Sequence, residues 1–238
     1  MHDPVELWVY LSAAPLVWLT LTVCTWLVAT EASIRMGRHP LANPVLTSVL
    51  MLSAALWLFE VPYERFFAGA QFVHFLLGPA TVAIAVPLFR QWNEVRRVLL
   101  PMGAALAVGS VVAVGSVLLL GHALGLSHEV LLSFLPKSAT AGVAMAISEG
   151  LGGDPSLTAV LVILTGIVGA LVVTPLMNAM GITDYAARGF AVGLTSHGIG
   201  TARAYDVDLT AGLFAGIAMA LNAIATSILV PIAARLAA

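Results

Sequence analysis

Charged side chains are scarce in this sequence. Asp, Glu, Lys and Arg make up 9% of its 238 residues, 60% are hydrophobic, and the mean hydropathy is +1.01. Soluble domains carry about 25% charged residues, so this composition excludes a water-soluble domain. It predicts an integral membrane protein, since about 20 consecutive apolar residues cross a bilayer as a helix. The net charge of −2 argues against a nucleic-acid partner.

Cysteine occurs once, as Cys24, so the chain has no disulfide framework. No HExxH spacing indicates a metal site, and we expect neither a metal nor another cofactor. Ser196 and His197 are adjacent in the chain, a poor arrangement for a nucleophile and its base, so we do not expect an enzyme. Asp3 and Glu6 precede the first apolar segment in place of basic residues, which favours a membrane span over a cleaved signal peptide.

The apolar segments predict an all-α, polytopic membrane protein with about seven to eight transmembrane segments. We interpret residues 1–238 as one transmembrane domain. Helix-breaking residues inside apolar sequence predict broken or re-entrant helices near 78–79 (Gly78, Pro79), 135–138 (Pro136) and 197–201 (Gly198). Whether residues 131–150 cross the membrane or return decides the side of the C-terminus, and the sequence leaves both alternatives open.

Basic residues predict the orientation. Five of the ten Lys and Arg residues follow the first and third apolar segments, as Arg35, Arg38, Arg90, Arg96 and Arg97. If the first three segments alternate, these loops lie on one side, and loops rich in Lys and Arg stay in the cytoplasm. We therefore expect the turn at Glu64 and the N-terminus on the opposite side.

Residues 131–153 place Lys137 and Glu149 inside apolar sequence long enough to lie in a bilayer. A charge near the midplane is costly and usually marks a substrate or ion path. Pro136 has no N–H and disfavours a helical residue before it, so we expect a helix to begin at 136–138. The unpaired N–H groups of that helix start, with Lys137 beside them, would form a site for a small anion.

A second polar cluster surrounds a helix break at residues 193–206. Three glycines within eight residues interrupt the helix beside His197. Exposed backbone at membrane depth is tolerated only where it lines a cavity or is buried in protein. Because the unperturbed pKa of histidine lies near neutral pH, we expect His197 to exchange a coupling proton, with Glu149 as the alternative. A histidine that only bonds a backbone carbonyl of the broken helix is the competing interpretation.

Other polar residues have simpler explanations. Arg203 could pair with Asp206 or extend to the membrane interface. Thr165, Asn178 and Asn222 are single polar residues on apolar segments. Hydrogen bonding between helices explains them more economically than substrate contact does.

The sequence also contains a faint internal repeat. Residues 80–85 match residues 139–144 at an offset of 59 positions, and each copy follows a break that contains proline. Alanine-rich helices produce such matches by chance, but many transporters are built from repeats whose broken helices meet at the membrane midplane. Counting of spans would make this repeat parallel rather than inverted.

The motifs resemble those of a known family. SFLPKSATAGVAMAISEGLGG and ARGFAVGLTSHGIGTARA closely resemble the LrgB/CidB family of bacterial membrane proteins, and LLGPATVAIAVPLF is similar to the family's other signature. The resemblance covers nearly all of the chain and implies a single LrgB-like domain in the bacterial inner membrane. The family includes the C-terminal half of the plant plastidic glycolate/glycerate translocator.

Residue by residue, the family's P-K-S-x-T motif begins at Pro136, its I-S-E motif ends at Glu149, and its S-H-x-I-G-T-A-R motif runs from Ser196 to Arg203. No motif residue is missing. The resemblance implies substrate binding by Lys137, Ser138, Thr140, Ser196, His197, Gly200, Thr201 and Arg203.

Two classes of function are open. The first is a secondary, proton-linked transporter of small monocarboxylates such as glycolate, glycerate, lactate or pyruvate. The second is a holin/antiholin-like protein that oligomerises and modulates murein hydrolase activity and autolysis. We favour the transporter, because charged residues at two helix breaks suit a carrier. The expected partners are a small organic acid anion, membrane lipid, further copies of the chain and a small LrgA/CidA-type membrane protein.

Overall fold

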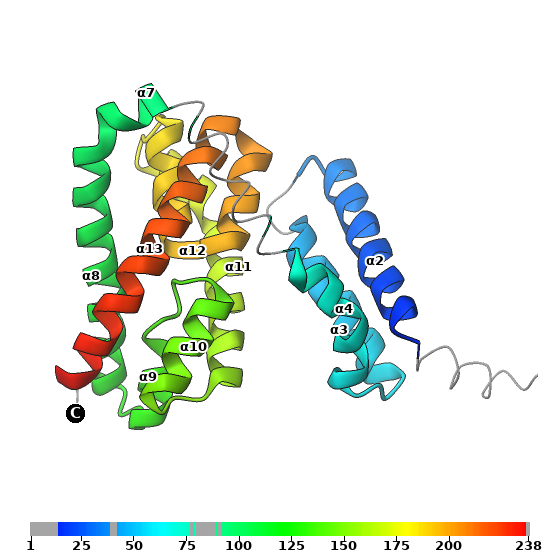
Figure 1. Ribbon diagram of the computed structural model, residues 1–238. Helices are drawn as coiled ribbons and strands as arrows, with labels where there is room; N and C mark the ends of the chain where they lie inside the picture. Colours follow the sequence, from blue (N-terminus) through cyan, green and yellow to red (C-terminus); the bar gives the residue numbers. More distant parts are fainter. Residues whose placement is uncertain (1–13, 39–41, 77–78, 80–88, 90–91, 237–238) are drawn as a thin grey trace, which may run out of the picture. The chain divides into compact units, whose positions relative to one another are not determined.

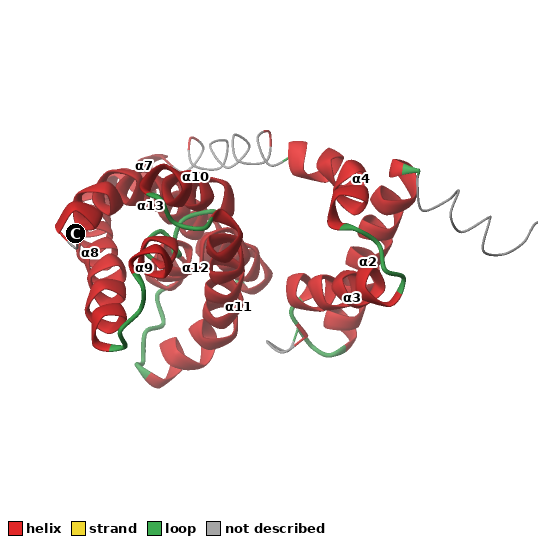
Figure 2. Cartoon of the chain, turned by 90° about the horizontal axis from the view of Figure 1, so that it is seen from below, coloured by secondary structure: helices red, strands yellow, loops and turns green. Residues whose placement is uncertain are grey.

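The computed structural model describes residues 14–38, 42–76, 79, 89 and 92–236. This part of the chain consists of helices, turns and loops without a strand (Figure 2), which confirms the all-α prediction. The chain divides into two compact units, residues 1–85 and 86–238. One domain over the whole chain stays a prediction. Of the break expected at 78–79, Gly78 lies outside the described residues, as does the repeat copy at 80–85.

The first unit contains α2 (Pro15–Arg35), α3 (Pro44–Leu58) and α4 (Tyr63–Phe75). Both α2 and α3 begin with a proline, which needs no hydrogen-bond partner in the first turn of a helix. The Asn43 side chain accepts hydrogen bonds from Val45 N and Leu46 N and so caps α3. α2 packs against both other helices, and Trp18, 1% exposed, contacts the Phe66 ring edge to face.

The second unit contains α7 (Trp92–Val95), η2 (Arg96–Val98), α8 (Leu99–Ala123), α9 (His128–Phe134), α10 (Ala141–Leu151), α11 (Pro155–Ala179), α12 (Tyr185–Val207) and α13 (Leu209–Leu236). Among the described residues, four apolar helices are long enough to cross a membrane: Pro15–Arg35, Arg96–Ala123, Pro155–Ala179 and Leu209–Arg235. The shorter apolar helices are Pro44–Leu58 and Ala141–Leu151. These lengths support the polytopic prediction.

The segment 128–151 is a helical hairpin, here called the first hairpin, and its tip is the turn 135–140. The arms α9 and α10 are held side by side by Thr158, whose Oγ1 lies 3.1 Å from the carbonyl oxygen of Ser133 and 2.7 Å from Ser148 Oγ. Gly152, with a φ of 89°, ends α10 in the left-handed conformation that glycine adopts at little cost. The segment therefore returns to the end of the unit at which it entered, which favours the re-entrant alternative over a full crossing.

The helix expected at 136–138 begins later, at Ala141. Lys137 N donates to Phe134 O at 3.1 Å and Ala139 N donates to Pro136 O at 2.9 Å, so these residues form tight turns. The carbonyl of Ser138, which would accept a helical bond, accepts one from the Asn222 side chain. Lys137 therefore lies in the turn before α10 and not in the first turn of that helix.

A second hairpin lies within α12. His197 has a φ of 42° and a ψ of −133°, a pair of backbone angles that lies outside the helical region. Residues 198–207 fold back along 185–196, since a Cβ on Gly200 would lie 2.8 Å from Val192 Cγ2, eight residues earlier. In a straight helix eight residues span about 12 Å. Residues 185–207 are here called the second hairpin, with His197 at its tip. The predicted break is confirmed, and it lies one residue before Gly198.

The two hairpins enter the second unit from opposite ends. α11 starts beside the first hairpin, where Asp154 N donates to Ser133 Oγ at 2.8 Å, and leads to the base of the second. With 25 residues it is about 37 Å long. Figure 1 shows the same arrangement, with α9 and α10 at one end of the unit and both ends of the α12 hairpin at the other. α8 and α11 are each 25 residues long and each is followed by a hairpin, an order of elements like that of transporters built from inverted repeats.

This arrangement predicts the topology of the second unit. With α8, α11 and α13 as the crossing helices and the two hairpins re-entrant, the α8–α9 loop and the C-terminus should lie on the side opposite the α11–α12 loop. We expect a thiol reagent to label Leu124→Cys only from outside and Thr183→Cys only from the cytoplasm, in a background without Cys24. Both positions are exposed. Labelling of both from one side would rule out two hairpins that return.

Candidate functional site at the two hairpin tips

Asn222 joins the two tips. It lies half-way along the 28 residues of α13 and is fully buried. Its Nδ2 donates to the carbonyl oxygens of Ser138, in the first tip, and Leu194, three residues before the second tip, each at 3.0 Å. Its Oδ1 accepts from Ser110 Oγ of α8 at 3.0 Å and from Thr226 Oγ1 at 3.4 Å. Both hairpins therefore end against one side chain.

His197 lies at the second tip with 4% of its surface exposed. Its Nε2 is 2.9 Å from the carbonyl oxygen of Val162 on α11. A carbonyl only accepts, so Nε2 carries the hydrogen and Nδ1 is the ring's remaining acceptor. Gly166 makes room for the ring, because a Cβ there would lie 2.7 Å from His197 Cε1. The histidine bonds a backbone carbonyl, but one of a neighbouring helix and not of its own.

Other polar residues surround the same tip. Ser196 is fully buried, with its Oγ 3.2 Å from Thr195 Oγ1. Thr201 is 5% exposed and its hydroxyl donates to the carbonyl of His197 at 2.7 Å. That hydrogen bond satisfies a backbone group at the break, where the regular ladder is interrupted. The tip is thus a hydrogen-bonded turn in which Ser196, His197 and Thr201 are buried, while Thr195 and Gly198 are exposed.

Close packing of α11 against this turn predicts a stability effect. A Cβ on Gly169 would lie 1.6 Å from Ser196 Oγ, so Gly169→Ala should lower the free energy of unfolding by about 1–3 kcal/mol. Gly115→Ala on α8 is the matched control, because a Cβ there meets nothing within 4 Å. Thermal unfolding of the purified proteins measures both, and Ser196→Gly should restore stability to Gly169→Ala. A Gly169→Ala protein as stable as the wild type would contradict this packing.

Lys137 lies at the first tip and is half-buried. Within the described residues, its side chain forms no hydrogen bond or ion pair. Ser138 is 4% exposed, and Thr140 stands immediately before the 11 residues of α10 without capping that helix through its hydroxyl. The first N–H groups of α10 therefore keep their donor capacity next to a cation, as an anion site requires.

The structure does not bring every predicted site residue to the tips. Arg203 is six residues past His197, about 9 Å along the return arm, and it lines a pocket with Arg188 towards the open end of the second hairpin. Glu149 is exposed, eight residues after α10 begins and so about 12 Å from its start. The remaining seven predicted binding residues lie at the tips or within about one turn of them.

Asn222 and its partner Ser110 were not predicted as site residues. Asn222 was expected to hydrogen-bond between helices, which is confirmed, as is the same expectation for Asn178, which accepts from Arg188 Nη2. A single asparagine at the centre of an apolar span was the available signal. The sequence did not show that the two acceptors would be backbone carbonyls at the helix breaks. These carbonyls are 84 and 28 residues away from Asn222 in the chain.

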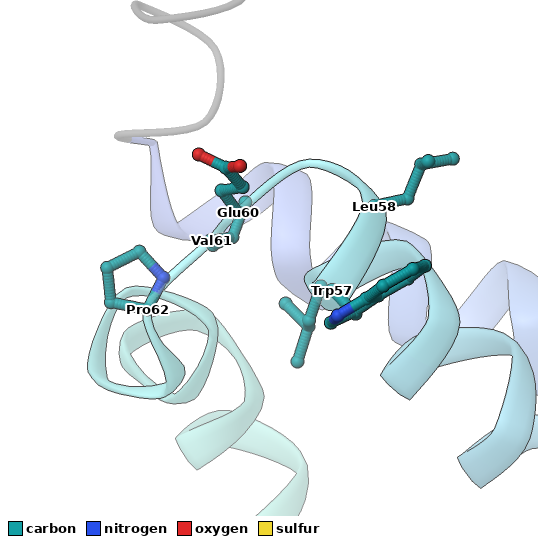
Figure 3. A pocket seen from close by; sticks show the side chains of 6 residues that line it. Trp57, Leu58, Glu60, Val61 and Pro62 are labelled. Carbon is teal, nitrogen blue, oxygen red and sulfur yellow. The ribbon is translucent and has the colours of Figure 1, made fainter.

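A further pocket lies in the first unit, at the turn between α3 and α4. Figure 3 shows its side chains, with the Glu60 carboxylate directed away from the Trp57 ring. Trp57 is 82% exposed, and Glu60 is the charged residue of the lining. A negative lining does not favour an anionic substrate. No group of three His, Cys, Asp or Glu residues suited to a metal occurs in the part of the chain that the structure describes.

Residues 22–236 match the model of the LrgB-like family, which covers most of the chain. The chain belongs to the LrgB-like family. The resemblance seen in its motifs is thereby confirmed, and with its long apolar helices this LrgB-like protein is a multi-pass membrane protein.

Similar proteins come from several bacteria. The uncharacterized protein YxaC of Bacillus subtilis (strain 168) is 34% identical over 214 residues, 90% of this chain and 93% of YxaC. The holin-like protein CidB of Staphylococcus epidermidis (strain ATCC 12228) is 28% identical over 194 residues, 82% of this chain and 85% of CidB. The holin-like protein CidB of Staphylococcus aureus (strain N315) is 29% identical over the same shares. No solved structure matches the chain significantly.

Proposed function

We propose that this LrgB-like protein is a secondary carrier of small organic acid anions. The observation that carries the proposal is the pair of hairpins that enter from opposite ends and meet at Asn222. Transporters built from inverted repeats bind their substrates near the membrane midplane, where discontinuous helices from both repeats come together. The second unit contains such an arrangement and holds a cation, Lys137, at one of the two breaks.

The chemistry of the first tip favours a carboxylate. Lys137 supplies a positive charge, and α10 directs its first N–H groups and the positive end of its dipole to the same turn. A carboxylate that enters would form an ion pair with Lys137 in surroundings poor in water. The attraction between the two charges offsets the free-energy cost of removing each of them from water. Monocarboxylates of two or three carbons, such as glycolate, glycerate, lactate or pyruvate, match this single cation. We place the carrier in the bacterial inner membrane.

Proton coupling is assigned to the second tip. His197 exchanges a proton through Nδ1 while Nε2–H stays bonded to Val162 O. Glu149 is the alternative coupling residue, but its exposed position towards the open end of the first hairpin supports it less well.

A holin-like function is the second candidate, and the comparisons favour it more directly. Two of the relatives described above are named holin-like protein CidB, and none of the three is named for transport. In this alternative the protein oligomerises, together with a small LrgA/CidA-type partner, and modulates murein hydrolase activity through the permeability of the membrane. The hydrogen-bonded hairpin tips favour a protein that passes selected solutes over one that forms an unselective pore, which is why we place the carrier first.

One experiment separates the two candidates. Proteoliposomes that contain a trapped fluorescent dye are supplied with labelled two- and three-carbon acids, with and without a pH gradient. A carrier gives saturable uptake that unlabelled acid competes away, and the dye stays inside. Release of the dye together with uptake that does not saturate would support the holin-like function and refute the carrier.

A further inference from the structure

We infer that Asn222 is the positioning residue that sets the distance between the two hairpin tips and thereby the geometry of the substrate site. The inference rests on the proposed function for its substrate, but the tip distance can be measured without any transport. Asn222 contacts Ser138 in one hairpin and Leu194 in the other with the same Nδ2 atom. A change at this atom acts on both tips together.

The amide is matched to its partners. The two carbonyls lie on the Nδ2 side, where the Ser138 hydroxyl is also 3.4 Å from Nδ2, and the hydroxyls of Ser110 and Thr226 lie on the Oδ1 side. An asparagine amide offers two N–H donors and two acceptor lone pairs, and all of them are used here. Aspartate has the same shape without the donors, and serine has one donor. No side chain of similar size other than asparagine can hold two carbonyls and two hydroxyls at one point.

The surroundings of Asn222 exclude solvent. It is 0% exposed, and Ala218 and Thr226, one turn before and after it on α13, are 0% and 1% exposed. Water therefore does not replace a lost hydrogen bond in this state. The backbone of the second hairpin packs closely on the same helix, because a Cβ on Gly193 would lie 2.0 Å from Ala215 O. The arm of the second hairpin is thus fixed by packing, whereas the separation of the tips depends on the Asn222 amide.

The test compares Asn222→Asp with two controls. Asn178→Asp makes the same chemical change at an exposed asparagine of α11, and Ser110→Ala removes one donor to Oδ1 but leaves both tip contacts. Spin labels on Thr140→Cys and Thr195→Cys, without Cys24, report the tip-to-tip distance. We expect a narrow distance distribution in the wild type and both controls, and a longer, broader one in Asn222→Asp.

The kinetic readout separates positioning from folding. Asn222→Asp should raise the KM for the carboxylate by roughly 10-fold or more with a smaller change in maximal rate, whereas a loss of folded protein lowers the maximal rate alone. The KM of Asn222→Ser, which keeps one donor, should lie between the KM of the wild type and that of Asn222→Asp.

Unchanged tip distance and KM in Asn222→Asp would overturn the inference. So would failure of both variants to fold, since Asn222 would then be a folding residue. A changed tip distance in a protein that transports nothing would support the inference and refute the carrier.

Discussion

Proteoliposomes that contain Lys137→Ala are expected to take up small carboxylates at a rate reduced by roughly 10- to 100-fold, the loss that removal of one charged hydrogen-bond partner produces. Lys137 is half-buried at the first tip and has no side-chain partner among the described residues. Its removal should therefore leave insertion and thermal stability close to wild type. Uptake of labelled acid, normalised to folded protein, measures the effect.

Two further variants sharpen this test. Lys137→Arg keeps the charge but has a larger, forked head group, so in a tight site it should also impair transport. Arg97→Ala removes an exposed cation from η2, just before α8, and should transport normally. A Lys137→Ala protein that transports at the wild-type rate would show that the anion site lies elsewhere.

The His197→Gln protein is expected to lose accumulation of acid driven by a pH gradient while it retains exchange of acid for acid. Glutamine keeps an N–H that can donate to Val162 O, the observed partner of His197, but it cannot titrate. Exchange needs the substrate site alone, whereas accumulation needs a group that gains and loses a proton. Gradient-driven uptake and counterflow in the same vesicles separate the two.

His122→Gln is the matched control for this variant. His122 also bonds a backbone carbonyl, with its Nδ1 2.8 Å from Leu118 O, but it is exposed at the end of α8. It should accumulate acid normally. Full gradient-driven uptake by His197→Gln would refute the coupling role, and so would wild-type transport that depends on sodium and ignores pH. Loss of both uptake and exchange would mean that His197 serves to hold the tip.

The sequence predicted the positions of the two breaks because each is caused locally. Pro136 has no N–H to donate to the preceding turn, and three glycines lie around His197, although Leu135 keeps helical dihedrals and the positive φ of the second break belongs to His197 itself. It also placed Lys137 and His197 at these breaks. The direction of the chain after each break was not predictable, because it depends on contacts between distant residues, such as Thr158 with Ser133 and Ser148.

The start of α10 and the repeat illustrate the same limit. Proline alone predicts a helix from 136–138, but the backbone is extended at Thr140 and α10 starts at Ala141, while the Ser138 carbonyl accepts from the Asn222 amide. The correspondence between α8 and α11, each followed by a hairpin, leaves almost no mark in the residues, since both are apolar spans whose sequences only have to suit lipid. The repeat noticed in the sequence, between 80–85 and 139–144, is a different one, and its first copy lies outside the described residues.

Protection of the two tips by substrate is the most direct measurement of a site between them. In a background without Cys24, single cysteines at Thr140, Thr195 and, as a control, Trp57 are reacted with a small membrane-permeant maleimide at increasing concentrations of a monocarboxylate. The account predicts that the acid slows the labelling of Thr140→Cys and Thr195→Cys at the same half-saturating concentration and leaves Trp57→Cys unchanged. Equal labelling of both tips with and without saturating acid would contradict it.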